Sequence, residues 1–356
     1  MANDDTMSNA DQYDYALPRD LIAQFPLPNR ADARLMVVKR YDGSISHHHI
    51  RDLPELLSPD DLLVLNDTRV VAARLVGYRT KTRGRWEGLF LSIDPQGQWR
   101  LLCKVKGRLA PPESITLVDR DGRDDVRLWL LEKHEGGVWA ARLEEAADPM
   151  ALLTRVGRVP LPFYIRGGEM VDADLNRYQT VYARVLGSVA APTAGLHFTP
   201  ELLGALARRG IDHCFVTLHV GLDTFRPIVT PSLEEHAMHS EWGCVDAPAA
   251  EMIRKARLAS RGRVVAVGTT TVRLLETAAD SQGCVPPWTG QTRLFVRPPY
   301  CFRAVDALLT NFHLPRSTLL VLVRTFGGDA LIRKAYKEAV RERYRFYSYG
   351  DAMLIL

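Results

Sequence analysis

Four short segments of the chain combine hydroxyl, imidazole, amide or carboxylate groups with glycine or proline. They are residues 191–199, 219–225, 268–271 and 311–317. Segment 268–271 (Gly-Thr-Thr-Thr) follows an apolar stretch and opens a helical pattern. Its free backbone N–H groups and three hydroxyls could receive a carboxylate or a phosphate, with Arg273 one turn later. An ordinary threonine cap at a helix start is the alternative, and no P-loop pattern is present.

Three of these segments carry a histidine, namely His197, His219 and His313. A histidine titrates near neutral pH and can therefore transfer protons, although a lone loop histidine is more often only a hydrogen-bonding partner. Ser317 in the last segment is also a plausible helix cap. Neither the histidine run at 47–49 nor the pair at 236 and 239 supplies a zinc ligand set, so we predict no metal.

Predicted secondary structure places these segments at strand ends. After residue 160, apolar strands alternate with helices, and the pattern predicts strands that end near 218–221 and span 263–267. It predicts helices at about 200–209, 249–260, 271–279 and 331–343, the first with Thr199 as its cap and Gly210 as its stop. This alternation is typical of an α/β domain with a mixed, partly parallel sheet, which binds ligands beyond its strand ends.

The sequence pattern is different from Arg74 to about residue 145. Five short strands are predicted there, at 88–93, 99–105, 114–118, 126–131 and 138–143, with turn sequences between them. Close spacing without an intervening helix favours a small antiparallel β-barrel inserted in the larger domain. We therefore predict a disordered polar tail at 1–12, a discontinuous α/β domain at 13–73 and 150–356, and a barrel at 74–149.

Composition sets outer limits on the class of protein. With 356 residues, 46% apolar and 25% charged, the chain resembles ordinary folded proteins and not disordered or fibrous ones. Its five scattered cysteines form no C-x-x-C pair, which favours a reducing compartment. No apolar stretch approaches the length of a membrane span. We expect a cytoplasmic protein with no membrane partner, and the net charge of +4 permits an anionic one.

Eight further motifs, taken in order after the N-terminal segment 15–26, resemble one known family. They are NDTRV at 66–70, YQTVYA at 178–183, AAPTAGLHF at 190–198, TLHVG at 217–221, HSEW at 239–242, VGTTTVR at 267–273, VDALLTNFHLP at 305–315 and YRFYSYGDAM at 344–353. The match covers nearly the whole chain. By these motifs the sequence is similar to the S-adenosylmethionine:tRNA ribosyltransferase-isomerase family of queuosine biosynthesis.

This resemblance implies an α/β domain interrupted by a β-barrel. It also implies transfer and isomerisation of the ribosyl part of S-adenosylmethionine onto the aminomethyl group of a 7-deazaguanine at the tRNA wobble position. Adenine and methionine leave, and epoxyqueuosine remains in the tRNA. S-adenosylmethionine is then a consumed co-substrate, no other cofactor is expected, and the protein is expected to be a monomer.

The chemistry assigns roles to residues in the matching motifs. A base starts the reaction by removing a ribose C5′ proton next to the sulfonium, and His197, His219 and His313 remain equal candidates. The methionine carboxylate suits Thr269, Thr270, Thr271 and Arg273, adenine suits Asn311, Asp351 or a histidine, and the incoming amine suits Asp67 or Glu241. The remaining candidate substrate-binding residues are Asn66, Arg69, Thr193, Gly195, Phe198, Thr224 and Tyr349.

Basic residues suggest where RNA phosphates could bind. The insertion carries Arg79, Lys81, Arg83, Arg85, Lys104, Lys106 and Arg108, and the C-terminal helix carries Lys334, Lys337 and Arg341. A solvated face is the alternative for each set. The family usually has glycine where this chain has Asp223. Two other functions stay open from the residues alone, a noncatalytic RNA-binding module and an α/β enzyme acting on a free nucleotide.

Overall fold

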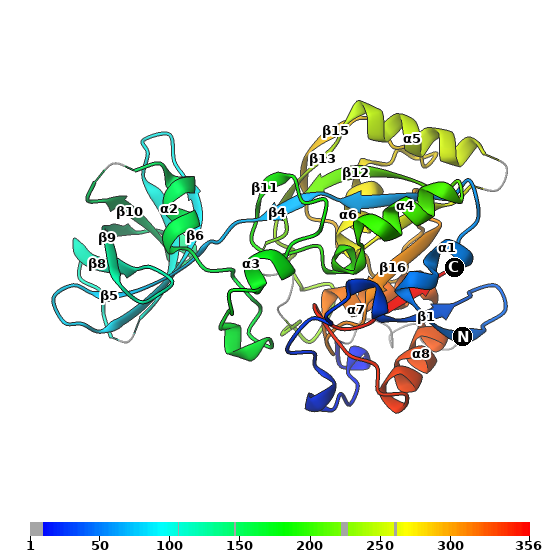
Figure 1. Ribbon diagram of the computed structural model, residues 1–356, viewed down its shortest axis with the longest axis horizontal. Coiled ribbons are helices and arrows are strands. Elements are labelled where there is room, and N and C mark those ends of the chain that lie inside the picture. The colour runs from blue at the N-terminus through cyan, green and yellow to red at the C-terminus, as the bar shows by residue number, and fades with distance from the viewer. Residues whose placement is uncertain (1–9, 106, 146, 222–226, 260–261) are drawn as a thin grey trace. The chain divides into compact units, whose positions relative to one another are not determined.

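The computed structural model describes residues 10–105, 107–145, 147–221, 227–259 and 262–356. Contacts divide the chain into two compact units. The first, here the α/β unit, contains residues 1–70, 162–167 and 177–356, and the second, here the barrel unit, contains residues 71–161 and 168–176. The predicted fold class, a mixed-sheet α/β fold with an inserted antiparallel barrel, is confirmed (Figure 1).

A nine-stranded mixed sheet forms the centre of the α/β unit, in the order β15-β13-β12-β3-β14-β16-β17-β1-β2. Its strands are β1 (Arg34–Val38), β2 (Ile45–His49), β3 (Leu62–Asn66), β12 (Asp212–Leu218), β13 (Glu241–Val245), β14 (Val264–Val267), β15 (Trp288–Thr292), β16 (Ala307–Asn311) and β17 (Ala352–Ile355). The four central strands β12, β3, β14 and β16 run parallel, and β1 and β17 are also parallel. The other pairs are antiparallel.

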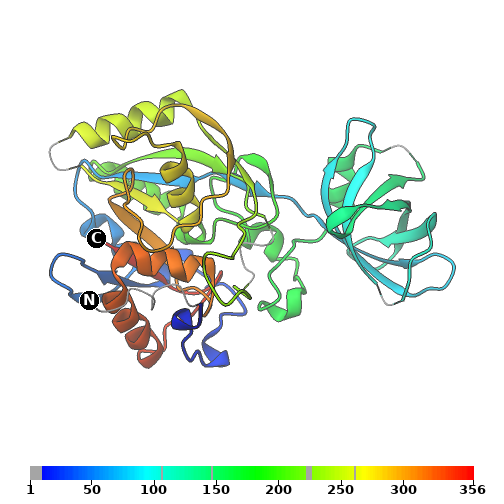
Figure 2. The ribbon, with the colours of Figure 1, turned by 180° about the vertical axis from the view of Figure 1, so that it is seen from behind.

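Alternation along β3 shows why the parallel strands are apolar throughout. Leu62 and Val64 belong to one hydrophobic cluster, while Leu63 and Leu65 belong to another. Since successive side chains of a strand point to opposite faces, the two clusters lie on the two sides of the sheet. Helices cover both faces, and Figure 2 brings α7 and α8 to the front.

The α-helices are α1 (Leu53–Leu56), α2 (Pro149–Val156), α3 (Asp174–Arg177), α4 (Pro200–Arg208), α5 (Ala247–Leu258), α6 (Thr269–Ala278), α7 (Thr318–Gly327) and α8 (Asp329–Arg341). Two predicted caps are confirmed, because the Thr199 hydroxyl accepts from the Leu202 N–H at 3.2 Å and the Ser317 hydroxyl accepts from the Leu320 N–H at 3.2 Å. Short 3-10 turns are η2 (Ala10–Tyr13), η3 (Arg19–Leu21), η4 (Arg30–Asp32), η5 (Ile50–Asp52), η6 (Glu135–Gly137), η7 (Arg166–Gly168) and η8 (Thr193–His197).

Six strands close the barrel, in the order β10-β7-β6-β5-β8-β9. They are β5 (Arg74–Arg79), β6 (Arg85–Ile93), β7 (Trp99–Val105), β8 (Glu113–Val118), β9 (Asp124–Lys133) and β10 (Val138–Leu143). The five predicted strands are present, but the prediction missed β5. Glycine and arginine obscure the apolar alternation of β5, and a Cβ at Gly77 would meet the Thr116 carbonyl oxygen at 2.2 Å. This strand needs its glycine for close packing.

Two segments differ from the predicted domain limits. Helix α2 lies in the barrel unit, not in the α/β unit, because its apolar residues Leu152, Leu153 and Val156 join the barrel core. Of the predicted tail, residues 1–9 lie outside the described residues, and residues 10–12 belong to η2. A separate two-stranded sheet pairs β4 (Thr68–Val70) with β11 (Val185–Ser188) in parallel. None of the helices among the described residues is long and apolar enough to cross a membrane.

Candidate functional site

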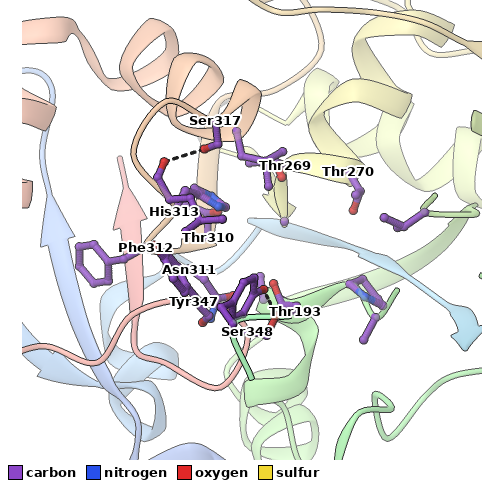
Figure 3. A pocket seen from close by; sticks show the side chains of 18 residues that line it. Thr193, Thr269, Thr270, Thr310, Asn311, Phe312, His313, Ser317, Tyr347 and Ser348 are labelled. Carbon is purple, nitrogen blue, oxygen red and sulfur yellow. Dashed lines mark hydrogen bonds between the residues drawn. The ribbon is translucent and has the colours of Figure 1, made fainter. Parts of the chain in front are cut away.

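A pocket lies beyond the carboxyl ends of β12, β14 and β16, with an empty volume of about 580 Å³ that includes space open to solvent. All four polar segments of the sequence contribute to its lining (Figure 3). Parallel strands end at the same edge of a sheet, so loops far apart in the chain meet there. The lining residues are Tyr164, Ala191, Pro192, Thr193, Ala194, Val220, Gly268, Thr269, Thr270, Thr310, Asn311, Phe312, His313, Leu314, Ser317, Leu319, Tyr347 and Ser348.

The start of α6 forms one wall of the pocket. Gly268 adopts a φ of 93°, a conformation that favours glycine, and turns the chain from β14 into the helix. Thr269 and Thr270 line the pocket, whereas the Thr271 hydroxyl donates to the Val267 carbonyl at 2.8 Å and is fully buried. Ser317, the cap of α7, lines the same pocket. Two helix N-termini therefore direct partial positive charge toward this space, which favours an anionic group.

His313 is the one predicted catalytic histidine among the lining residues. Its Nε2 lies 2.8 Å from the Thr310 hydroxyl, and its side chain is 8% exposed. Burial lowers its pKa to about 3, because the charged imidazolium would lose its hydration. The ring is therefore neutral at physiological pH and has one unprotonated nitrogen, but a pKa this low also makes it a weak base.

His197 lies behind the pocket wall. Its Nε2 is 3.3 Å from the Asn311 amide nitrogen, and burial, followed by the positive charges of Arg30 and Arg345, lowers its pKa to about 4. It lines a second, smaller pocket with Arg30, Arg177, Tyr349 and others. His197 is thus close to the main pocket but separated from it by Asn311.

His219 is held beside the main pocket. Its Nδ1 lies 2.8 Å from the Thr68 hydroxyl, and its ring stacks on Trp242 at a centroid distance of 5.1 Å. A Cβ at Gly187 would meet the His219 Nε2 at 2.6 Å, so backbone covers the ring there. Its neighbour Val220 lines the pocket, but His219 does not. Burial lowers its pKa as well.

Asn311 ends β16 and is 2% exposed. Its amide nitrogen donates to the Tyr347 carbonyl at 3.1 Å and approaches the Asp351 carbonyl at 3.4 Å. Its Oδ1 is buried and accepts no hydrogen bond from the described residues. Buried amide oxygens are normally satisfied, so a water molecule or a ligand would have to supply the donor for this atom.

Arg273, expected to hold a carboxylate, is already engaged. It forms a buried ion pair with Glu241, its Nε donates to the Leu294 carbonyl at 2.9 Å, and neither Arg273 nor Glu241 lines the pocket. Glu241 also accepts from the Gly221 N–H at 3.0 Å. Two buried opposite charges stabilise one another and hold α6 to β13. The pair with Glu241 gives Arg273 a structural role, while its buried Nη2 has no hydrogen-bond partner among the described residues.

Asp67 and Asn66 likewise connect elements of the fold. Asp67 accepts from Arg184 at 2.8 Å and from the Thr217 hydroxyl at 2.7 Å. Asn66 exchanges hydrogen bonds with the backbone of Leu218 at 3.0 Å in each direction. These contacts join β3 to β12 and leave Asp67 away from the lining of the pocket.

The other predicted binding residues divide between the pocket and its surroundings. Thr193 lines it, and Gly195 leaves room for Tyr182, whose hydroxyl would lie 2.2 Å from an added Cβ. Phe198 is fully buried in the core, and Tyr349 lines the smaller pocket. Residues outside the pocket lining include exposed Arg69 and buried Asp351, which accepts from the backbone N–H groups of Arg34 and Arg345. Thr224 and Asp223 lie outside the described residues.

Sequence reasoning did not select Tyr164, Tyr347 and Ser348 for this pocket. Tyr164 and Tyr347 rings lie 4.6 Å apart, and the Tyr164 hydroxyl lies 2.7 Å from that of Ser348. Tyr347 and Ser348 precede β17, which runs antiparallel to β16 and so begins where β16 ends. The aromatic motif at 344–353 contained the signal, but only strand direction selects which of its aromatic residues lines the pocket.

Basic residues of the barrel unit are partly neutralised by their neighbours. Arg79 forms a two-point ion pair with Glu113 at 2.9 and 3.0 Å, and Arg85 pairs with Glu87 at 2.8 Å. Arg83 stacks on Tyr78 and lies 3.9 Å from Asp124. Exposed basic residues also include Lys81, Lys104 and Arg108, while Lys106 lies outside the described residues.

In the α/β unit, Lys334, Lys337 and Arg341 are exposed on α8, and Arg341 pairs with Glu342 at 3.0 Å. No cluster of three or more His, Cys, Asp or Glu suited to a metal ion occurs in the part of the chain that the structure describes.

Comparisons with known proteins agree with this arrangement. A family model described as queuosine biosynthesis protein matches residues 10–355. The chain is 49% identical to the S-adenosylmethionine:tRNA ribosyltransferase-isomerase of Symbiobacterium thermophilum, covering 97% of this chain and 98% of that one. It is 46% identical to the protein of the same name from Xylella fastidiosa, covering 98% of each.

A solved structure is similar across the same length. The crystal structure of S-adenosylmethionine tRNA ribosyltransferase from Thermotoga maritima aligns with a TM-score of 0.54 and 35% identity, and the alignment covers 97% of this chain and 100% of that one. Both the sequence and the fold therefore match over their full extent. The chain belongs to the queuosine biosynthesis protein family.

Proposed function

We propose that this protein is an S-adenosylmethionine:tRNA ribosyltransferase-isomerase that converts a wobble 7-aminomethyl-7-deazaguanine of tRNA to epoxyqueuosine. The observation that carries the proposal is full-length membership of the family, with relatives of this name up to 49% identical. The pocket at the strand ends supports it, because polar loops from several of the family motifs meet there, as expected of a ligand site in an α/β sheet. We place the enzyme in the cytoplasm as a monomer, without a metal or a further cofactor.

The start of α6 binds the methionine carboxylate of S-adenosylmethionine. Thr269 and Thr270 present hydroxyls and the first N–H groups of a ten-residue helix to the pocket. These groups attract an anion without a cationic side chain, and Arg273 supports the same helix through its buried pair with Glu241. In this assignment the carboxylate is bound by backbone N–H groups and hydroxyls, and not by Arg273 as the sequence suggested.

His313 acts as the base that removes the ribose C5′ proton. The neighbouring sulfonium makes this proton more acidic, and an uncharged imidazole inside the pocket can receive it. When Nε2–H donates to the Thr310 hydroxyl, Nδ1 is the proton acceptor. Burial of the ring also limits bulk water, which would otherwise return the proton to the ylide.

Exposed basic residues bind the tRNA phosphates. Lys81 and Arg108 of the barrel unit, together with Lys334 and Lys337 of α8, are exposed and available to a polyanion. The wobble nucleoside must leave its stack to reach a buried pocket, and phosphate contacts elsewhere on the anticodon stem supply binding energy for that step.

The test incubates the protein with S-adenosylmethionine and tRNA that carries or lacks the aminomethyl-deazaguanine. Adenine release and the mass of the digested wobble nucleoside are measured. We expect release and an added ribosyl unit only with the modified tRNA. Equal adenine release from both tRNAs, or release without tRNA, would instead indicate an enzyme acting on a free nucleotide, and binding without release would indicate an RNA-binding module.

A further inference from the structure

Tyr347 has an unusual backbone for a bulky residue. Its φ is 73°, in the left-handed region where large side chains are rare, and its side chain is 5% exposed and lines the main pocket. Such a conformation costs free energy, and it persists where surrounding contacts enforce it, often at binding sites. The position of Tyr347 is therefore imposed by its neighbours.

Three hydrogen bonds hold the backbone of Tyr347 in this conformation. The Tyr347 N–H donates to the Phe312 carbonyl at 3.1 Å, and its carbonyl accepts from the Asn311 amide at 3.1 Å and from the Gly350 N–H at 2.9 Å. Asn311, the last residue of β16, and Phe312, the next residue, belong to the segment that carries much of the polar lining of the pocket. Figure 3 shows the Phe312 ring pointing away from this space, while Tyr347 lies beside Asn311 and Ser348.

The same hydrogen bonds determine which way the Asn311 carboxamide is oriented. Its amide nitrogen faces the carbonyl oxygens of Tyr347 and Asp351, which accept hydrogen bonds but cannot donate them. The orientation of the carboxamide is thereby determined, and its buried Oδ1 remains an acceptor without a donor among the described residues. The amide nitrogen of Asn311 is therefore used within the protein, and the side chain has only an acceptor left for a ligand.

We infer that Tyr347 and Asn311 form the adenine subsite of this pocket, in which Tyr347 stacks on the purine and the Asn311 Oδ1 accepts from its 6-amino group. This inference rests on the proposed function. Figure 3 places the pair across the pocket from Thr270, where the methionine carboxylate binds, so the two ends of S-adenosylmethionine occupy opposite ends of the site. Tyr347 with Tyr164 supplies the aromatic surface, and a purine with a 6-amino donor satisfies Asn311 Oδ1, the one buried side-chain polar atom without a partner among the described lining residues.

The subsite selects the substrate by the atom at purine position 6. A 6-oxo purine would place an oxygen against the Asn311 Oδ1, and two acceptors cannot share a hydrogen bond. A 6-hydrogen purine would leave Oδ1 unsatisfied but without that repulsion. A buried site built around a hydrogen bond rejects an analogue that lacks it.

Calorimetry on the full chain tests this with S-adenosylmethionine and its 6-oxo and 6-hydrogen analogues, in the absence of tRNA. We expect the 6-oxo analogue to bind about 10- to 100-fold more weakly and the 6-hydrogen analogue to fall between the two. Dissociation constants within threefold for all three ligands would overturn the inference. This outcome would leave the proposed function intact, because adenine release with modified tRNA tests that separately.

Variants sharpen the same measurement. Asn311→Leu removes the acceptor, so the ratio between the natural ligand and the 6-oxo analogue should shrink to less than threefold. Tyr347→Leu should weaken the binding of all three ligands by a similar factor. Tyr347→Phe should weaken binding less, because it keeps the aromatic ring. Tyr41→Leu, an exposed position remote from the pocket lining, is the control. If a variant fails to fold, the comparison of ligands on the wild-type chain still decides.

Discussion

The α/β unit and the barrel unit use charge in opposite ways. Among the described residues, the lining of the main pocket includes no Asp, Glu, Lys or Arg, and two of the predicted charged residues, Arg273 and Glu241, are paired in the interior. The barrel unit instead carries exposed cations, among them Arg85, which is 71% exposed beside Glu87. A pocket lined by helix ends and hydroxyls can bind a zwitterion without a competing ion, whereas exposed cations suit a large polyanion in water.

His313→Gln tests the pocket side of this comparison and should have the largest effect. The rate of adenine release should fall by roughly 10²- to 10⁴-fold, because glutamine cannot accept the C5′ proton. The dissociation constant for S-adenosylmethionine, measured by calorimetry, should change far less than the rate. His134→Gln in the barrel unit, an exposed position, is the matched control and should leave the rate unchanged. Equal rates for the two variants would remove His313 as the base.

Arg273→Ala compares a buried ion pair with an exposed one. Loss of the arginine strands the Glu241 carboxylate in the interior, so the free energy of unfolding should fall by about 3–5 kcal/mol in urea titrations. Arg85→Ala in the barrel unit should cost less than about 1 kcal/mol, since its pair is exposed. A stable Arg273→Ala protein with weakened S-adenosylmethionine binding would restore the carboxylate role that the sequence suggested.

Acid should destabilise the α/β unit through its buried neutral histidines. Burial lowers the pKa of His313 to about 3, so between about pH 6.5 and 3 the unfolded chain binds a proton at this histidine and the folded chain does not. The free energy of unfolding is therefore unaffected by this histidine above the unfolded pKa of about 6.5. It decreases as the pH falls toward 3, and the decrease is roughly 3 kcal/mol at pH 4. Thermal unfolding of wild type and His313→Gln between pH 7 and 4 measures this. Parallel pH curves for the two proteins would contradict it.

Salt dependence of tRNA binding tests the barrel side and should give the smallest effect. Neutralising Lys81 and Arg108 together should reduce the slope of log affinity against log salt by roughly 1–2, because two phosphate contacts are lost. Arg79→Gln should change the slope less, since Glu113 already neutralises this arginine. An unaltered slope for the double variant would exclude the barrel unit as the docking surface.

Local patterns in the sequence determined most elements of the fold. Thr199 and Ser317 cap helices as predicted, and the apolar run at Val264–Val267 is a buried parallel strand. These features depend on neighbouring residues only, and on periodicities of 2 and 3.6 that a sequence displays directly. Strand β5 was not predicted, because its formation depends on the close approach of Gly77 to Thr116, which is distant in sequence.

Motif order alone also identified the family, but it could not choose among three histidines. Tertiary structure made that choice, because the direction and order of the strands decide which polar groups share a pocket. His313 faces it, His197 lies behind Asn311, and His219 is held between Gly187 and Trp242. The left-handed turn at Tyr347 and the orphaned oxygen of Asn311 arise from contacts across 36 residues, where no local propensity operates.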